Sequence, residues 1–129
     1  MLLVDHVDLN VGSLETSVPF YDLLLPWFGL KKVLTSDDVV GYTDGHFALY
    51  LIPCDTARKF QSHRVGLNHL AFKAESREKV DALHAFLKEH NVDVLAAPRE
   101  ATGHAEGYYS FFFRDPNRIR LEYAFCPRR

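Results

Sequence analysis

The feature that most constrains the fold of this 129-residue chain is an internal repeat. Residues 4–11, VDHVDLNV, alternate between apolar and polar side chains, which predicts a strand with one buried face. Residues 67–74, LNHLAFKA, repeat this pattern 63 residues later. His6 and His69 hold matching places, because each stands seven residues before a serine. The chain is therefore expected to contain two copies of one structural unit.

A helix is expected after each of these strands. Ser13 and Ser76 are suitable N-cap residues, and each is followed two positions later by a glutamate, whose charge suits a helix N-terminus. The first helix is expected to run to about Trp27 and to be closed by Gly29. The second is expected to end at Asn91. Its apolar stripe consists of Val80, Leu83, Phe86 and Leu87.

Three short strands are expected after each helix. In the first half they lie at about 31–35, 38–43 and 46–52, and in the second at about 93–97, 108–114 and 118–125. Asp44-Gly45 suits a two-residue hairpin turn between the last two strands of the first half. Each half therefore has the order βαβββ, and the predicted fold class is α+β.

The chain is long enough for one domain with a real core. We expect a single domain over residues 1–129, with module one at about 1–53, a polar linker at about 54–66 and module two at about 67–129. The helix of each half is expected to cover the apolar side of its strands. The opposite side is then available as a concave wall.

Composition and charge argue against several classes of protein. A content of 47% hydrophobic and 25% charged residues is that of an ordinary soluble globular protein. The formal net charge is −2, with no basic cluster for nucleic acid or an anionic membrane surface. No apolar stretch approaches the ~20 residues of a membrane span, and MLLVDHVDLN has no signal-peptide pattern. The lone cysteines Cys54 and Cys126 fit a reducing, cytoplasmic setting.

Three metal-ligating side chains share the wall face of their strands. His6, His69 and Glu122 each lie opposite the apolar face of an alternating run. Two imidazoles and one carboxylate form a facial triad, which leaves about three positions open on a six-coordinate ion. Such an ion can chelate a substrate through two oxygens and stabilise developing negative charge. Spacing alone leaves a metal site and a solvated wall as equal alternatives.

At these residues the sequence resembles the vicinal oxygen chelate superfamily, which includes glyoxalases, fosfomycin-resistance thiol transferases, extradiol ring-cleaving dioxygenases and bleomycin-resistance proteins. The resemblance rests on DHVDLNV, SVPFYDLLLPWFGLKK, LNHLAFKA and FFFRDPNRIRLEYAF. It implies that the two βαβββ modules form a cupped mixed sheet, with helices on the outer face and a metal at its floor. It also implies that His6, His69 and Glu122 hold one divalent ion (Fe, Mn, Ni, Co or Zn), often in a homodimer.

Two positions depart from the family pattern. Tyr50 stands where glyoxalases and related epimerases place a fourth ligand, usually a glutamate or glutamine that is also linked to proton abstraction. Glyoxalase activity is therefore not expected. Arg118 stands where the family usually has a glycine in the turn before the last strand. Asn117 tolerates left-handed dihedrals, so the turn is expected to shift by one residue.

The residues that would act beside the metal are less constrained. Strand alternation puts Asp8, Asn10, Tyr50, Phe112 and Arg120 on the same wall. A proton-transfer reaction would need a base, for which Tyr50, Asp8 and His104 are the candidates. The loop 98–109, which carries His104, suits either a cover over a ligand or a mobile hairpin connection.

Three functions remain open from the sequence. The first is a metal-dependent lyase, transferase or dioxygenase that chelates a small oxygen-rich substrate, with Fe(II) or Mn(II) needed for the oxidative variant. The second is a metal-free small-molecule binding protein of the bleomycin-resistance type. The third is a non-catalytic copy of the fold. A homodimer is expected in each case, because paired βαβββ modules leave sheet edges that a partner commonly covers.

Overall fold

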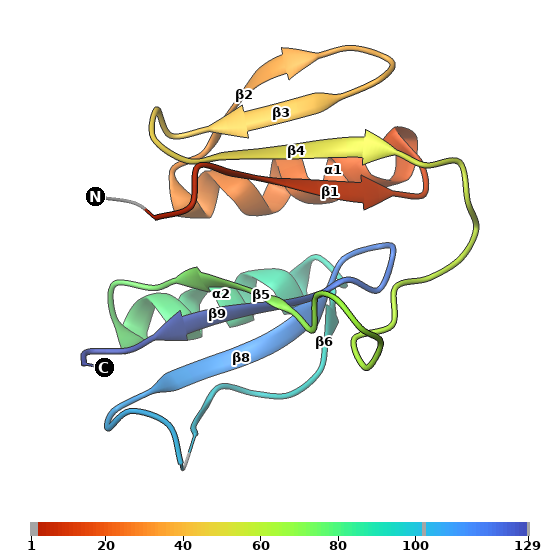
Figure 1. The fold of residues 1–129 in the computed structure, drawn as a ribbon. Coiled ribbons are helices and arrows are strands. Elements are labelled where there is room, and N and C mark those ends of the chain that lie inside the picture. Colours follow the sequence, from red (N-terminus) through yellow and green to blue (C-terminus); the bar gives the residue numbers. More distant parts are fainter. Residues whose placement is uncertain (1–2, 102, 129) are drawn as a thin grey trace. The chain divides into compact units, whose positions relative to one another are not determined.

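The chain folds into two compact units, Met1–Lys59 and Phe60–Arg129 (Figure 1). The computed structural model describes residues 3–101 and 103–128. Within these residues, no helix has the length and apolar character needed to cross a membrane.

The first unit has the order βαβββ that the sequence predicts. Its elements are β1 (His6–Val11), α1 (Leu14–Leu24), a 3₁₀-helix (Leu25–Phe28), β2 (Lys31–Thr35), β3 (Val40–Thr43) and β4 (Ala48–Pro53). They form a four-stranded sheet in the order β1-β4-β3-β2. The β1–β4 pair is parallel and the other two pairs are antiparallel, so the sheet is mixed.

The second unit repeats this arrangement. Its elements are β5 (Leu70–Lys73), α2 (Arg77–Glu89), β6 (Asp93–Val94), β7 (Arg99–Glu100), β8 (Tyr109–Arg114) and β9 (Arg120–Phe125). The sheet order is β5-β9-β8-β6, and β7 pairs with β8. The parallel pair is again the first and last strand, β5 and β9. The predicted α+β class and the two βαβββ modules are therefore confirmed.

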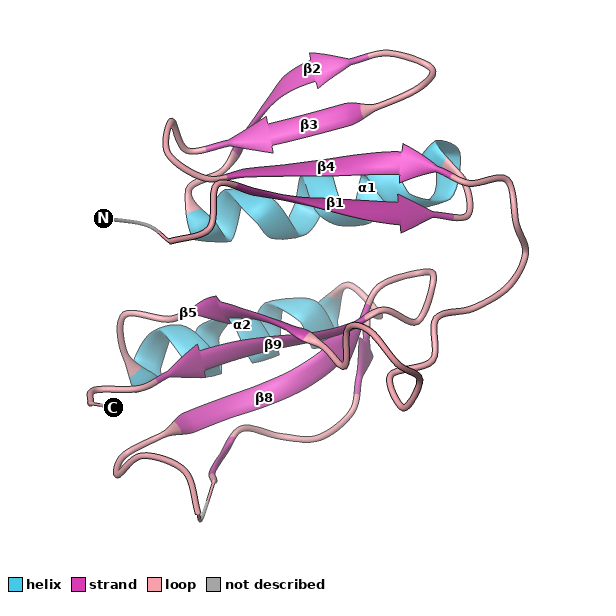
Figure 2. Ribbon diagram, in the orientation of Figure 1, coloured by secondary structure: helices cyan, strands magenta, loops and turns pink. Residues whose placement is uncertain are grey.

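In each unit one helix lies along one face of the sheet (Figure 2). Leu9 and Val11 of β1 are buried, whereas His6, Asp8 and Asn10 on the alternate positions are exposed. In the second unit Val80, Leu83 and Leu87 of α2 are buried in the core with the apolar side chains of β8 and β9. The alternation predicted for the strands thus separates a packed face from an open one.

Both helices begin at the predicted serines. The Ser13 side chain accepts a hydrogen bond from the backbone N–H of Thr16 at 3.2 Å, and Ser76 accepts one from Lys79 at 3.1 Å. The first helix is shorter than predicted, because the α-helix ends at Leu24 and a 3₁₀-helix follows. Pro26 lies at the start of that 3₁₀-helix and has no N–H to continue the α-helical pattern.

The hairpin between β3 and β4 differs from the predicted two-residue turn. Its connection is residues 44–47, because Thr43 pairs with Ala48. The Asp44 carboxylate accepts hydrogen bonds from the backbone N–H groups of Phe47 (2.8 Å) and His46 (2.9 Å). These two bonds lower the pKa of Asp44 and stabilise the longer loop. β7 is also unpredicted, because its two polar residues carry no alternation signal.

The turn before β9 is built on the buried Asp115. Its Oδ1 accepts hydrogen bonds from the backbone N–H groups of Asn117 and Ile119, each at 2.8 Å. The predicted shift of the turn is wrong, because Arg118 itself takes the left-handed conformation with φ 65°. Three hydrogen bonds stabilise this conformation. The Arg118 N–H donates to the Asp115 carbonyl at 2.9 Å, and the Asp115 carboxylate accepts from the N–H groups of Asn117 and Ile119 on either side of Arg118.

Gly41 of β3 lies under the ring of Tyr50 in β4. The two residues are register partners, and a Cβ at position 41 would lie 2.7 and 2.8 Å from two ring carbons of Tyr50. These distances are shorter than van der Waals contact, so any larger residue would displace the ring. Gly41 therefore helps to fix where Tyr50 lies on the open face of the first sheet.

We expect Arg118→Gly to raise the free energy of unfolding by about 1 kcal/mol, since glycine removes the left-handed strain but gains freedom in the unfolded chain. Urea denaturation of the full chain measures the change. Arg58→Gly is the matched control, because this exposed loop residue has no positive φ and its replacement should only destabilise. Equal effects of the two substitutions would contradict the strain argument.

We expect Gly41→Ala to lower the free energy of unfolding by about 1–3 kcal/mol, because the new methyl group overlaps the Tyr50 ring. In a Tyr50→Ala background the same substitution should be neutral or stabilising, since alanine is better than glycine in a strand. A double-mutant cycle by chemical denaturation measures the coupling between the two positions. An equal loss in both backgrounds would show that the ring is not the obstacle.

Candidate metal centre

The open face of the first sheet carries His6, Asp8 and Tyr50. Parallel pairing sets His6 opposite Ala48 and Asp8 opposite Tyr50, so these side chains lie on one face of adjacent strands. The rings of His6 and Tyr50 meet edge to face with centroids 5.7 Å apart, and Nε2 of His6 lies 3.7 Å from Oδ1 of Asp8. Three of the predicted residues of this unit, His6, Asp8 and Tyr50, are thus brought together on one wall.

The imidazole of His6 is oriented by the residue that precedes it. Its Nδ1 donates a hydrogen bond to Oδ2 of Asp5 at 2.8 Å, and this bond raises the pKa of His6 above its ordinary value. A carboxylate on Nδ1 fixes the tautomer with its proton there, which leaves the Nε2 lone pair available to a metal. The side chain is half exposed, with 48% of its surface accessible.

The second unit brings His69 and Glu122 into direct contact. Glu122 lies in β9 opposite Ala71 of β5 and Phe112 of β8, and only 3% of its surface is accessible. Nε2 of His69, in the residue just before β5, lies 3.0 Å from Oε1 of Glu122. The charge in the middle of β9 is therefore buried against a histidine rather than solvated.

The partners of His69 leave a lone pair facing the carboxylate. Its Nδ1 lies 2.6 Å from Oδ1 of Asn68, whose Nδ2 donates to the carbonyl of Ser62 at 3.1 Å. That second bond fixes the amide so that Oδ1 accepts the proton on Nδ1. In the neutral ring Nε2 is then an acceptor, and it faces an acceptor oxygen of Glu122. Two acceptors this close repel each other unless a cation binds both atoms or Nε2 carries a second proton.

Both histidines are thus oriented by the same kind of hydrogen bond. In each repeat the residue immediately before the histidine accepts the Nδ1 proton: Asp5 for His6 and Asn68 for His69. Metal-binding histidines are commonly oriented in this way by a hydrogen bond to the ring nitrogen that is not a ligand. The donor set therefore fits a divalent cation that takes imidazole and carboxylate ligands.

The other oxygen of Glu122 is bound by Tyr108. The Tyr108 hydroxyl donates to Oε2 at 2.7 Å, and the ring of His104 stacks on Tyr108 with centroids 5.0 Å apart. His104 is thus linked to Glu122 through one aromatic ring. The sequence analysis missed Tyr108, although the alternation through Ser110 and Phe112 would have placed it on the same wall.

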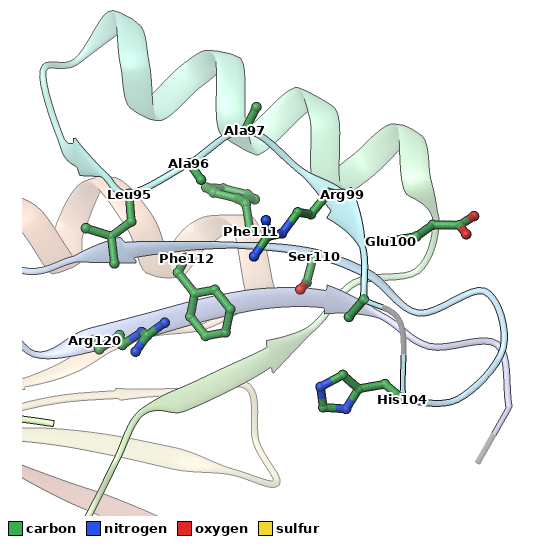
Figure 3. Close-up of a pocket in the computed structure, with 11 residues that line it drawn as sticks. Leu95, Ala96, Ala97, Arg99, Glu100, His104, Ser110, Phe111, Phe112 and Arg120 are labelled. Carbon is green, nitrogen blue, oxygen red and sulfur yellow. The ribbon is translucent and has the colours of Figure 1, made fainter. Parts of the chain in front are cut away.

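A pocket adjoins this cluster on the second unit (Figure 3). Its volume is about 470 Å³, within the range of small-molecule sites. Phe112 lines it and also contacts the ring of His69 edge to face, with centroids 5.1 Å apart. Arg120, which alternation predicts on the wall, lies over Phe112 with its guanidinium carbon 4.3 Å from the ring centroid. His104 lines the same pocket.

Neither unit completes a metal site by itself. Over residues 3–101 and 103–128, no group of three or more His, Cys, Asp or Glu side chains is placed to hold a metal ion. The second unit supplies His69 and Glu122 as a close pair. The predicted third ligand, His6, lies in the first unit beside Asp8 and Tyr50.

Comparison with known proteins agrees with the fold. The chain is 32% identical over 120 residues to the uncharacterised protein YqjT of Bacillus subtilis, covering 91% of this chain and 94% of that protein. It is 36% identical to a glyoxalase-like protein of Bacillus halodurans, whose crystal structure matches with a TM-score of 0.84 over 95% of both chains.

More distant structures share the fold alone. The fosfomycin resistance protein FosX of Listeria monocytogenes matches with a TM-score of 0.72 at 18% identity, covering 97% of this chain and 93% of that one.

The family model for the glyoxalase/bleomycin resistance protein/dioxygenase superfamily matches residues 3–123. Because this match spans nearly the whole chain, the protein belongs to the glyoxalase/bleomycin resistance protein/dioxygenase superfamily.

Proposed function

We propose that the protein is a metal-dependent enzyme that chelates a small oxygen-rich substrate on one divalent ion held by His6, His69 and Glu122. The observation that carries this proposal is the contact of 3.0 Å between Nε2 of His69 and Oε1 of Glu122. Because Asn68 takes the proton on Nδ1, this contact joins two acceptors, and a cation satisfies both. Either the same chain or a partner subunit would supply His6.

The ion would supply Lewis-acid polarisation of the chelated oxygens. The chain's own residues orient the ligands: Asp5 and Asn68 hold the two imidazoles, and Tyr108 holds Oε2 of Glu122. One carboxylate leaves the site with net positive charge, which favours a substrate that develops an oxyanion. The reaction is then an isomerisation, an addition or an oxygen insertion.

The choice among these reactions depends on which group moves a proton. Asp8 is half exposed and lies beside Nε2 of His6, which makes its carboxylate the first candidate base. Tyr50 is the second candidate, because it is the register partner of Asp8 and its ring lies edge to face with that of His6. His104 is the third candidate, because it lines the pocket and stacks on Tyr108. Tyr50 in place of an acid argues against glyoxalase chemistry.

A metal-free binding protein of the bleomycin-resistance type is the second candidate function. The pocket beside Phe112 supports it, because a volume of about 470 Å³ is enough for a small ligand without any metal.

We propose the cytoplasm as the location in either case, since Cys54 and Cys126 are both free thiols.

Metal analysis tests the enzyme proposal. After chelation and reloading with Fe(II), Mn(II), Co(II), Ni(II) or Zn(II), we expect about one ion per chain for one of these metals. Glu122→Gln and His69→Ala should each lose most of the bound ion, because a ligand is removed. Asn68→Ala should weaken metal affinity by about 10- to 100-fold, because the imidazole loses its orienting partner.

His46→Ala is the matched control for the metal analysis, because His46 lies in the 44–47 turn and is not a proposed ligand. It should bind the metal as the wild type does. Unchanged metal content in Glu122→Gln would place the ion elsewhere and refute the ligand set.

We also propose a homodimer. β2 is an edge strand of the first sheet and exposes Val33 and Leu34, with 62% and 43% of their surfaces accessible. An open edge with apolar side chains is commonly covered by a partner. Sedimentation equilibrium should give twice the 14.8 kDa monomer mass. Val33→Lys should shift the equilibrium toward monomer, whereas a monomeric wild type at all concentrations would rule the dimer out.

A further inference from the structure

We propose that the pocket of the second unit binds the anionic group of a small organic acid, a carboxylate or a phosphonate, through Arg99 and Arg120. This inference rests on the proposed function, because it names the class of substrate that would reach the metal. The pocket lies wholly within the second unit and is lined by residues of β8 and β9, by residues between 95 and 101, and by His104.

Arg120 carries a donor without an acceptor. Its Nε is buried and has no hydrogen-bond partner among the residues that the structure describes. The stack on Phe112 holds the guanidinium in place but gives Nε no acceptor. Because Nε is enclosed by protein atoms, a ligand in the pocket would meet the Arg120 guanidinium at its terminal Nη atoms instead.

The neighbouring acids are already paired with other groups. Glu122 lies two residues along β9, but its Oε2 accepts from Tyr108 and its Oε1 faces Nε2 of His69 rather than Arg120. Asp93 is 3.5 Å from Arg114, the register partner of Arg120. No carboxylate in the described part of the chain forms an ion pair with Arg120, so its charge remains available.

Arg99 adds a second positive charge to the lining of the same pocket. Its side chain points into the pocket, whereas the carboxylate of Glu100 points away (Figure 3). Glu100 is the one acid among the described lining residues, and it is ion-paired with Arg77 outside the pocket. The interior therefore presents two guanidinium groups, which suit the oxygens of a carboxylate or phosphonate.

The rest of the pocket suits a compact apolar body. Leu95 and Phe112 line it together with three alanines, at 96, 97 and 101. Its volume of about 470 Å³ accommodates a ring with a few substituents. Phe112 touches both Arg120 and His69, so an anion on Arg120 would hold the remainder of the molecule beside the proposed metal ligands.

Isothermal titration calorimetry of the full chain with three probes tests the proposal. Benzoate and phenylphosphonate carry the two anionic groups, and benzamide is the neutral analogue of benzoate. We expect at least one anion to bind saturably and benzamide to bind at least about 10-fold more weakly, as expected for a charge-assisted hydrogen bond. The stronger anion shows whether the site prefers a carboxylate or a phosphonate.

Two substitutions assign the anion to the arginines. Arg120→Gln and Arg99→Gln should each weaken binding of the anion by about 10-fold or more. Arg114→Gln is the matched control, because Arg114 is paired with Asp93 and does not line the pocket. If circular dichroism shows that Arg120→Gln does not fold, Arg99→Gln alone tests the anion site. Arg99 is exposed in β7, so its replacement should not disturb the fold.

The titration separates this inference from the proposed function when it is repeated on metal-free and metal-loaded protein. Anion binding by a chain that takes up no metal would refute the enzyme proposal and support the anion site. Metal binding without anion binding would support the enzyme proposal and refute the anion site. Equal affinities for benzoate and benzamide, or wild-type anion affinity in both arginine variants, would overturn the inference.

Discussion

The parallel pairing of the first and last strands in each unit is the constraint on which the candidate site depends. The β1–β4 ladder sets Asp8 beside Tyr50 and His6 beside Ala48, and the β5–β9 ladder sets Ala71 beside Glu122. Parallel neighbours cannot be joined by a tight turn, so the chain must cross over between them. The helix and the intervening strands fill that crossover. The strands extend the sheet, and the helix covers one of its faces and leaves the other for polar side chains.

The repeat extends beyond the histidines to what orients them. A neutral imidazole has one donor nitrogen and one acceptor nitrogen, and the residue before it decides which is which. A carboxylate serves this purpose in the first unit and an amide in the second. The amide is uncharged, so it adds no negative charge beside His69 and Glu122. His6, by contrast, has two carboxylates near it, from Asp5 and Asp8.

Alternation and capping serines predicted most of the elements, because each is a local signal, whereas β7 has only two polar residues and gave no such signal. The same period of two also predicted which side of the sheet carries His6, Asp8 and Glu122. What the sequence could not provide was the set of contacts between distant side chains, such as Tyr108 on Glu122 or Tyr50 over Gly41. The left-handed Arg118 was missed for a different reason: residue preference favours Asn117, but the bonds to Asp115 determine the turn.

The spacing of charges along β9 limits what a substrate can look like. Arg120 and Glu122 lie on the same face two residues apart, a separation of about 7 Å along an extended strand. Opposite charges at this spacing often neutralise each other, yet Oε2 of Glu122 accepts from Tyr108 and Oε1 faces Nε2 of His69 instead. Under the proposed function and the proposed anion site, the strand would present one carboxylate to a cation and one guanidinium to an anion. A molecule that uses both must place its anionic group and its chelating oxygens at opposite ends of a short body.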